Sequence, residues 1–430
     1  MIVGIRREDK NEWEARVPLI PSDVEKLTSK GIRVILQPSN IRIFSDQEFL
    51  AVGAEIAEDL SECSLILAVK EIPVEFIENG KTYLFFSHTI KGQEENMPLL
   101  QAMIDRKTQL IDYERIIDNN GQRLIFFGRH AGLAGMINTF WAFGKRLDYE
   151  GITNPFSKIK KTFEYRGLEN AAAYLQEIAD IIKKNGLPQT INPIVCGFTG
   201  YGNVSQGAQE IFDIFPYEEI SPEQLLNKTD LPGNTLYKVV FKESDMVEAI
   251  DPNKKFDLQD YYDNPQKYKA KFEQYLPKLS ILVNCIYWDL PYPRLVALDY
   301  LKNAYRKSVD QKLRVIGDVS CDINGAIQCT VKSTDSGNPV FVYNPFDGSI
   351  REGVAGTGPV IMAVDNLPCE LAEEASKAFS NVLINFIPQL AGADYNLDFK
   401  KLKLPPELLG GMILYQGQLT AEYTYLNQYL

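Results

Sequence analysis

A glycine-rich turn between an apolar run and an amphipathic run restricts the folding of this 430-residue chain most strongly. The apolar run Pro193–Phe198 predicts a buried strand, and residues 200–207 then read GYGNVSQG. The next segment, AQEIFDIF, has the pattern of a helix. A strand, a glycine turn and a helix in this order predict a βα unit on a mainly parallel sheet.

The same turn predicts a dinucleotide site. Gly200 and Gly202 allow a tight turn whose backbone N–H groups reach a pyrophosphate at the start of the helix, which begins with Asn203 and Val204. Ser205 stands where the usual fingerprint has a third glycine. A glycine-rich turn without any ligand is therefore the alternative.

The adenosine end of that site is predicted from the next strand. An acidic residue about 20 positions after the turn normally binds the ribose 2′-hydroxyl. Here the strand is predicted over residues 217–221 and ends at Ser221, which has no carboxylate. This favours NADP(H), with NAD(H) as the alternative.

The first 115 residues alternate helix and strand signals, which predicts βαβ units. Capping boxes at Ser22–Glu25 and Ser45–Glu48 predict two helix starts. The segments SLILAV, YLFFS and QLIDY predict buried parallel strands.

Polar residues follow each of these three strands. Lys70, His88 and Glu114 stand at or just beyond the predicted strand ends. Because the carboxyl ends of parallel strands share one edge, these side chains are expected to converge on a pocket. Nearby polar residues, expected to bind substrate, are Glu71, Lys91 and Gln93. The alternative is a solvated Lys70–Glu71 pair and a structural His88.

A chain of this length is too long for one core, which indicates two domains. We predict an α/β protein with two Rossmann-like, doubly wound domains, formed by residues 1–135 with 368–430 and by residues 136–367. The polar stretch of about 218–277 is predicted to be an insertion in the second sheet, and the tail from Pro368 is predicted to be helical.

Composition excludes several classes of function. The net charge of −12 argues against a nucleic-acid groove or an anionic membrane surface as partner. No apolar run approaches the length of a membrane span, and no signal peptide is evident. Six cysteines without a C-x-x-C pair indicate free thiols in a cytoplasmic protein. Two histidines predict no metal site.

Two charged features have alternative interpretations. The run RREDKNEWEAR near the N-terminus is typical of a solvated face, although Arg16 could clamp a carboxylate bidentately. Asp318 ends the predicted strand RVIGDV, where it either faces the cofactor edge or caps Ser320 or Cys321 as a buried structural residue. His130 is assigned no catalytic role.

Nine segments in order along the chain carry a family resemblance. They are IRREDKNEWEARVPL, ILAVKEIP, YLFFSHTIKGQ, LIDYERIID, FFGRHAGLAGMIN, FTGYGNVSQGAQ, VNCIYW, IGDVSCD and AVDNLP. Together they resemble the lysine–2-oxoglutarate reductase family, to which lysine-forming saccharopine dehydrogenases are similar. Alanine dehydrogenase and transhydrogenase are more distant relatives.

The resemblance implies a cleft between a substrate domain and a cofactor domain, with Lys70 and His88 as the acid–base pair. It implies that Arg16 and Gln93 contact the dicarboxylate part of saccharopine, and that Glu71 and Glu114 flank the lysine-side amine. Implied cofactor contacts are Gly202, Asn203, Val204, Cys285, Ile286, Asp318, Val319 and Ser320. Gly200, Ser221 and Asn284 complete the set of predicted cofactor residues. Lysine-forming relatives carry an arginine near Gln122 and an aspartate near Ser221, so both departures bear on the cofactor.

The resulting hypothesis is reductive condensation of L-lysine and 2-oxoglutarate to saccharopine, a reversible reaction of small molecules that uses NAD(P)H. An alanine dehydrogenase-like enzyme and a non-catalytic nucleotide-binding regulator are the two alternatives. A homo-oligomer is compatible with the sequence, which leaves the physiological direction open.

Overall fold

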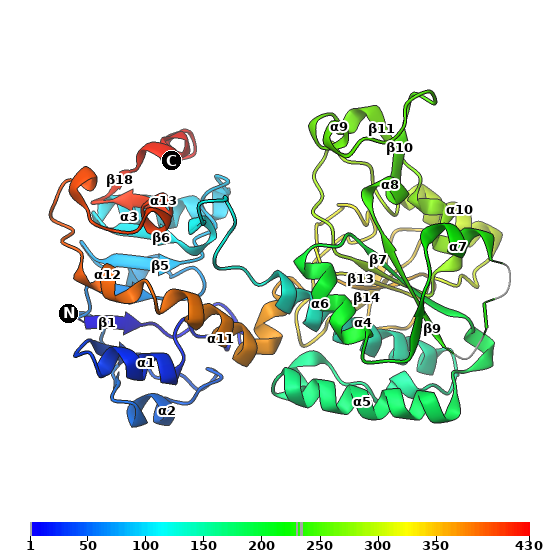
Figure 1. The fold of residues 1–430 in the computed structure, drawn as a ribbon, viewed down its shortest axis with the longest axis horizontal. Helices are drawn as coiled ribbons and strands as arrows, with labels where there is room; N and C mark the ends of the chain where they lie inside the picture. Colours follow the sequence, from blue (N-terminus) through cyan, green and yellow to red (C-terminus); the bar gives the residue numbers. More distant parts are fainter. Residues whose placement is uncertain (1, 229–230, 233–234) are drawn as a thin grey trace. The chain divides into compact units, whose positions relative to one another are not determined.

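The computed structural model describes residues 2–228, 231–232 and 235–430. It divides the chain into two compact units, Met1–Phe127 with Ala372–Leu430, and Gly128–Leu371. The division coincides with the start of helix α4 (Gly128–Tyr149), whereas the sequence predicted it at residue 136, within that helix. In Figure 1, α11 (Ala372–Leu383) and α12 (Ile387–Gly392), in orange, lie with the first unit although they come late in the chain.

The first unit contains an eight-stranded sheet of order β18-β17-β6-β5-β4-β1-β2-β3. Its parallel strands are β1 (Ile2–Ile5), β2 (Arg33–Leu36), β3 (Glu55–Ile56), β4 (Leu65–Leu67), β5 (Thr82–Phe85) and β6 (Gln109–Asp112). These include the three buried strands predicted from SLILAV, YLFFS and QLIDY. Their parallel register brings the residues after β1, β4, β5 and β6 to one edge.

Two expectations for this unit need correction. Helix α1 (Pro21–Thr28) begins one residue before Ser22, with Ile20 as its N-cap and no side-chain cap. Proline at the first helical position fixes that start, because its missing N–H is not needed there. The tail is not wholly helical, since β17 (Met412–Tyr415) pairs antiparallel with β6 and β18 (Gln418–Leu419) extends the sheet.

The second helix of this unit was predicted correctly. Helix α2 (Asp46–Ala51) has Ser45 as its N-cap, and the reciprocal capping box with Glu48 is formed. Helix α3 (Met97–Asp105) leads to β6. The apolar faces of these strands and helices form one continuous core with the C-terminal segments.

The second unit also contains an eight-stranded sheet, of order β15-β14-β16-β13-β12-β7-β9-β8. Its parallel strands are β7 (Ile194–Thr199), β8 (Tyr217–Glu219), β9 (Leu236–Phe241), β12 (Ile281–Asn284), β13 (Val315–Asp318) and β16 (Val360–Met362). Antiparallel β14 (Val340–Tyr343) and β15 (Ile350–Glu352) close one side. Helices α4, α5 (Leu168–Asn185) and α6 (Asn203–Phe212) pack in the core of this unit.

The predicted insertion at 218–277 is wrong for its first part. Strand β9 lies inside the sheet, between β7 and β8. Lys238 interrupts the apolar pattern of LYKVVF, but its buried side chain carries the ammonium to Asp213, 2.8 Å away. Residues after β9 do form an added element, in which the hairpin of β10 (Val247–Ala249) and β11 (Tyr268–Ala270) pairs outside the main sheet.

None of the helices in the described parts of the chain has the length and apolar character that a bilayer crossing requires.

Candidate functional site

Side chains that follow two neighbouring strands, β4 and β5, meet at the edge of the first sheet. Glu71 follows β4 and His88 follows β5, and His88 Nδ1 forms a short hydrogen bond with Glu71 Oε1. The backbone of His88 has φ of +50°, a left-handed conformation that a non-glycine residue rarely adopts. Such conformations persist where surrounding contacts hold them, and they are frequent at functional sites.

Glu71 is also bound by a cation from the N-terminal run. Lys10 Nζ lies 2.8 and 3.0 Å from its two carboxylate oxygens. Burial acts to raise the pKa of Glu71, but hydrogen bonds from His88 and Lys10 outweigh it and lower the pKa to about 2. Glu71 is therefore an anion at neutral pH that orients His88.

Lys70 directly precedes Glu71, and a buried carboxylate binds its backbone. Glu8 accepts backbone hydrogen bonds from Val69 at 2.6 Å and from Lys70 at 2.9 Å, which holds the turn that carries Lys70. Burial, and then the charge of Arg16, lower the pKa of Lys70. A lysine with a lowered pKa can exchange protons nearer neutral pH than an exposed one.

The charged N-terminal run is exposed in its middle, over residues 9–12, but four of its charged side chains are buried, contrary to the expectation of a solvated face. Arg6, Glu8, Glu14 and Arg16 are each less than a tenth exposed. Arg16 donates from Nε and Nη2 to the two oxygens of Glu14, at 2.7 and 2.6 Å, and its guanidinium lies over the ring of Phe127. Buried charges require partners, and the mixed signs of this run supply them.

The remaining predicted substrate residues have different environments. Glu114 lies at the end of β6 and forms an ion pair with Arg123. Gln93 is half-buried, and its Oε1 is buried with no hydrogen-bond partner among the described residues. An orphaned buried acceptor of this kind indicates a missing donor. Lys91 is exposed.

In the second unit, the glycine turn joins β7 to α6 as predicted. Gly200 has φ of +80°, so the turn requires glycine there. Gly202 is the N-cap of α6, and no atom lies within 4 Å of where its Cβ would be. The open N-terminus, which begins at Asn203 and Val204, fits a pyrophosphate.

The close packing that the third glycine of the usual fingerprint allows is provided here by Gly207, two positions after Ser205. Ser205 is fully buried and accepts from Gln209 Nε2 at 3.0 Å. A Cβ on Gly207 would lie 2.1 Å from the carbonyl oxygen of Arg129 in α4, so Gly207 permits the close approach of α6 to α4. The fingerprint departs from the usual spacing because the close contact is made with a helix.

A buried polar network lies beneath this turn. Asn284 accepts from Thr199 Oγ1 at 2.9 Å and donates to Asp318 at 2.8 Å, while Thr330 also donates to Asp318. Burial raises the pKa of Asp318 to about 6. Asp318 also accepts from the N–H of Cys321 at 3.4 Å, as the structural alternative predicts. The network therefore ties together the ends of β7, β12 and β13.

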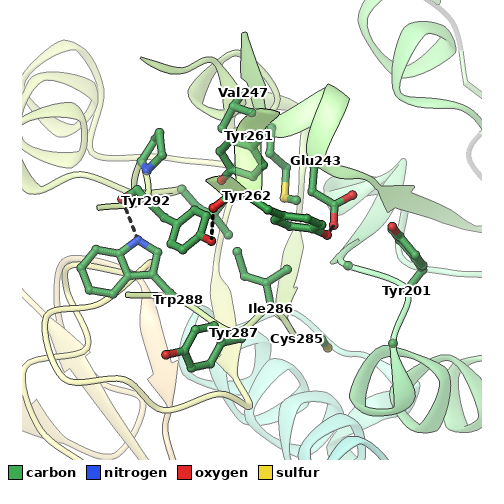
Figure 2. Close-up of a pocket in the computed structure, with 15 residues that line it drawn as sticks. Tyr201, Glu243, Val247, Tyr261, Tyr262, Cys285, Ile286, Tyr287, Trp288 and Tyr292 are labelled. Carbon is green, nitrogen blue, oxygen red and sulfur yellow. Dashed lines mark hydrogen bonds between the residues drawn. The ribbon is translucent and has the colours of Figure 1, made fainter. Parts of the chain in front are cut away.

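Other predicted cofactor residues surround the same strand ends. Cys285 N donates to Thr199 Oγ1 at 3.3 Å, and Ser320 Oγ donates to the carbonyl oxygen of Ile286 at 2.6 Å. Val319 N donates to the carbonyl oxygen of Asn284 at 3.1 Å. A pocket of about 320 Å³ lies above the turn, lined by Gly200, Gly202, Cys285 and Ile286 among others (Figure 2).

Ser221 lies apart from these residues and requires correction. It follows β8, the edge strand, and is the exposed N-cap of α7 (Pro222–Asn227), where its hydroxyl accepts from Gln224 N at 3.1 Å. Strand β8 is second in chain order, but β9 lies between it and β7. Ser221 therefore does not follow the strand next to the glycine turn, as its predicted role requires.

The comparisons with known proteins match both units. The family model "Alanine dehydrogenase/PNT, N-terminal domain" matches residues 4–134, and "Alanine dehydrogenase/PNT, C-terminal domain" matches residues 247–422. An L-alanine dehydrogenase structure superposes with a TM-score of 0.61 at 16% identity, covering 100% of this chain and 99% of its own. At that identity the likeness shows the fold, two Rossmann-like α/β domains.

Two kinds of curated relative also match. "Alpha-aminoadipic semialdehyde synthase" of Arabidopsis thaliana is 38% identical over 99% of this chain, which spans 41% of that relative's length. "Saccharopine dehydrogenase [NAD(+), L-lysine-forming]" of Yarrowia lipolytica is 29% identical over 90% of this chain and 92% of its own. The chain thus spans less than half of the first relative and nearly all of the second.

Proposed function

Because this chain belongs to the family of lysine-forming saccharopine dehydrogenases and aminoadipic semialdehyde synthases, we propose that it catalyses the reversible, nicotinamide-dependent condensation of L-lysine and 2-oxoglutarate to saccharopine. The observation that carries this proposal is the Glu71–His88 hydrogen bond beside Lys70, whose pKa is lowered by burial. Two proton-exchanging groups at one sheet edge suit imine formation, which needs both an acid and a base.

In the proposed reaction, the ε-amine of lysine attacks the keto carbon of 2-oxoglutarate to form a carbinolamine. Of Lys70 and His88, one removes a proton from the nitrogen and the other donates a proton to the leaving oxygen, so that water departs and the imine remains. Glu71 holds the His88 ring throughout. The nicotinamide, when bound, would supply the hydride that reduces the imine carbon. The residue that removed the proton from the nitrogen returns it there, which completes the secondary amine of saccharopine.

Substrate recognition is proposed for Arg16, Lys91 and Gln93 on the dicarboxylate side, and for Glu71 and Glu114 on the side of the lysine amine. The orphaned Oε1 of Gln93 supports a role for that residue, since a bound N–H or O–H group would satisfy it. A cytoplasmic location and a homo-oligomer remain predictions.

The cofactor is proposed to bind at the glycine turn, the start of α6 and the ends of β12 and β13. The proposed contacts are Gly200, Gly202, Asn203, Val204, Asn284, Cys285, Ile286, Asp318, Val319 and Ser320. The open Gly202 cradle and the pocket beside it fit a dinucleotide. The sequence-based preference for NADP(H) depended on Ser221 and loses its support, so the choice between the two cofactors depends on the segment that follows β9.

The test is the absorbance of the reduced nicotinamide, followed with NADH and with NADPH. Lysine with 2-oxoglutarate should oxidise the cofactor, and ammonia with pyruvate should not. The opposite substrate preference indicates an alanine dehydrogenase-like enzyme. Cofactor binding without oxidation by either pair indicates a nucleotide-binding regulator, and either result refutes the proposal.

A further inference from the structure

The order of strands in the second sheet identifies a different residue at the adenosine end of the pocket. In a Rossmann sheet the residue that binds the ribose follows the strand adjacent to the one that carries the glycine turn. Here that adjacent strand is β9, which pairs in parallel with β7 along its whole length. The N–H of Gly200 donates to the carbonyl oxygen of Phe241, the last residue of β9, at 2.9 Å. The glycine turn is therefore tied directly to the end of β9.

Glu243 stands two residues after this bond and lines the same pocket as Gly200 and Gly202. Its carboxylate accepts a hydrogen bond from the hydroxyl of Tyr262 at 2.8 Å. Figure 2 shows the carboxylate between the Tyr262 and Tyr201 side chains. The charge of Glu243 raises the pKa of Tyr201, as expected for two groups that lie close together.

The pocket is otherwise uncharged and aromatic. Among the described residues that line it, Glu243 is the only one that carries a charge, and Tyr261 and Trp288 contribute apolar ring surface. Such a wall suits a flat purine base, and a single carboxylate suits a vicinal diol, whose two hydroxyl groups can both donate to it.

We infer that Glu243, held by Tyr262, binds the ribose hydroxyls of an unphosphorylated adenosine and makes the protein selective for NAD(H) over NADP(H). This rests on the proposed function only in that a nicotinamide dinucleotide binds at the glycine turn. A 2′-phosphate carries close to two negative charges and would replace one of the hydroxyl donors. It would meet the Glu243 anion without a cation in the pocket wall, which disfavours binding.

Cations just outside the pocket lining could reverse this preference. One is Arg294, whose guanidinium lies over the ring of Trp288, 4.9 Å from its centroid. A second is the exposed residue Lys242. It precedes Glu243, and its backbone N–H donates to Asp245 at 2.9 Å. If either cation bound a 2′-phosphate, the wild-type protein would prefer NADPH. That result would overturn the inference.

The experiment measures dissociation constants of NADH and NADPH by fluorescence titration, without substrates, for the wild-type chain of 430 residues and for its Glu243→Gln variant. We expect the wild type to bind NADH more tightly by roughly 10–100-fold, the factor that a hydrogen bond to a charged group usually contributes. Glu243→Gln should weaken NADH binding and strengthen NADPH binding, so that the ratio approaches one. Tyr262→Phe, which removes the donor and keeps the ring, should shift the ratio in the same direction by less.

Glu248→Gln is the matched control. Glu248 is an exposed carboxylate on β10 that pairs with Lys269 at 3.1 Å, outside the pocket lining. Its substitution should leave the NADH/NADPH ratio unchanged. A wild-type ratio near or below one, or an unchanged ratio in Glu243→Gln with the fold intact by circular dichroism, overturns the inference.

Substrate assays separate this inference from the proposed reaction. If the wild type prefers NADH and Glu243→Gln removes that preference, the inference stands even where lysine and 2-oxoglutarate fail to oxidise the cofactor. If those substrates do oxidise the cofactor but NADPH is bound as tightly as NADH, the reaction stands and the role of Glu243 is refuted.

Discussion

The carboxylate of Glu8 accepts the backbone N–H of Lys70 at 2.9 Å, sixty-two positions away in the chain. With its second bond, to Val69 at 2.6 Å, Glu8 closes the turn after β4 against the segment after β1. The two oxygens thus hold the backbone on both sides of the Val69–Lys70 peptide bond. Glu8 is a positioning residue that sequence reasoning assigned to a solvated cluster.

The first prediction concerns stability and pH. Burial, and then the charge of Glu14, raise the pKa of Glu8 from 4.5 to about 7. A raised pKa means that the folded protein binds the proton more tightly than the unfolded chain does. The contribution of Glu8 to stability is therefore fully present below pH 4.5 and is lost as the pH rises to about 7.

Glu8→Gln removes this titration. As the pH rises across that window, the free energy of unfolding of the wild type should fall by roughly 3 kcal/mol relative to that of the variant. Urea unfolding at several pH values measures it. Asp318 and Glu370 also have raised pKa values, near 6 and 7, but they are present in both proteins and cancel in the difference. A difference that is constant with pH contradicts the prediction.

The second prediction tests the proposed acid–base role of Lys70. Lys70→Met keeps most of the buried side-chain volume and removes the ammonium, so turnover should fall by ~10²–10⁴-fold with the thermal unfolding midpoint nearly unchanged. Because the pKa of Lys70 is lowered, the wild-type pH profile should contain a limb where this group loses its proton, and the variant should lack that limb. The rate rises along this limb if Lys70 is the base and falls if it is the acid.

The control for this variant is Lys30→Met, which removes an exposed ammonium from the same unit. It should leave both turnover and the pH profile as they are. Wild-type turnover in a folded Lys70→Met protein would eliminate the assigned role.

The third prediction addresses Glu71 as the residue that orients His88. Glu71→Gln keeps the shape of the side chain but replaces the anion that holds His88 Nδ1 and Lys10 Nζ. Misorientation of a catalytic group should lower kcat by about 10–100-fold. KM for the dinucleotide, which is bound by other residues, should change little. Glu95→Gln, an exposed carboxylate nearby in the chain, is the control. An unaltered kcat, or an effect confined to KM, would assign Glu71 to binding.

The sequence predicted those parts of this site that depend on the hydrophobic pattern of single strands. Strands β4, β5 and β6 are short apolar runs, so their positions and the shared edge of Lys70, His88 and Glu114 could be predicted. Side-chain contacts between residues that are far apart in the chain could not be predicted. Nothing in the spacing of Glu8 or Lys10 indicates that they reach Val69 or Glu71.

Strand β9 illustrates the second limit. Lys238 made LYKVVF resemble part of a polar insertion, because the sequence does not distinguish a buried lysine that has a distant partner from an exposed lysine. This error also affected the predicted cofactor preference. Without β9, the strand that ends at Ser221 would be the one next to the glycine turn. Strand order along a sheet is a property of long-range contacts, and chain order does not determine it.

The last prediction compares Gly202, the N-cap of α6, with Gly207, which lies inside that helix. Gly207→Ala would place a Cβ 2.1 Å from the Arg129 carbonyl oxygen, a backbone atom of α4 that cannot move aside without shifting the helix. Overpacking of this kind costs about 1–3 kcal/mol or more, so the unfolding midpoint should fall. Gly202→Ala meets no atom within 4 Å, and its φ of −75° suits alanine, so stability should be retained.

Dinucleotide affinity should respond to Gly202→Ala, since the new methyl group occupies the open cradle at the start of α6 where a pyrophosphate would approach the backbone. Thermal unfolding and fluorescence titration, performed on both variants, separate the two effects. Gly207 would then be the packing glycine of the fingerprint and Gly202 the binding glycine. If Gly202→Ala binds NADH and NADPH as the wild type does, the phosphates do not lie at this turn, and the cofactor assignment for the second unit fails with them.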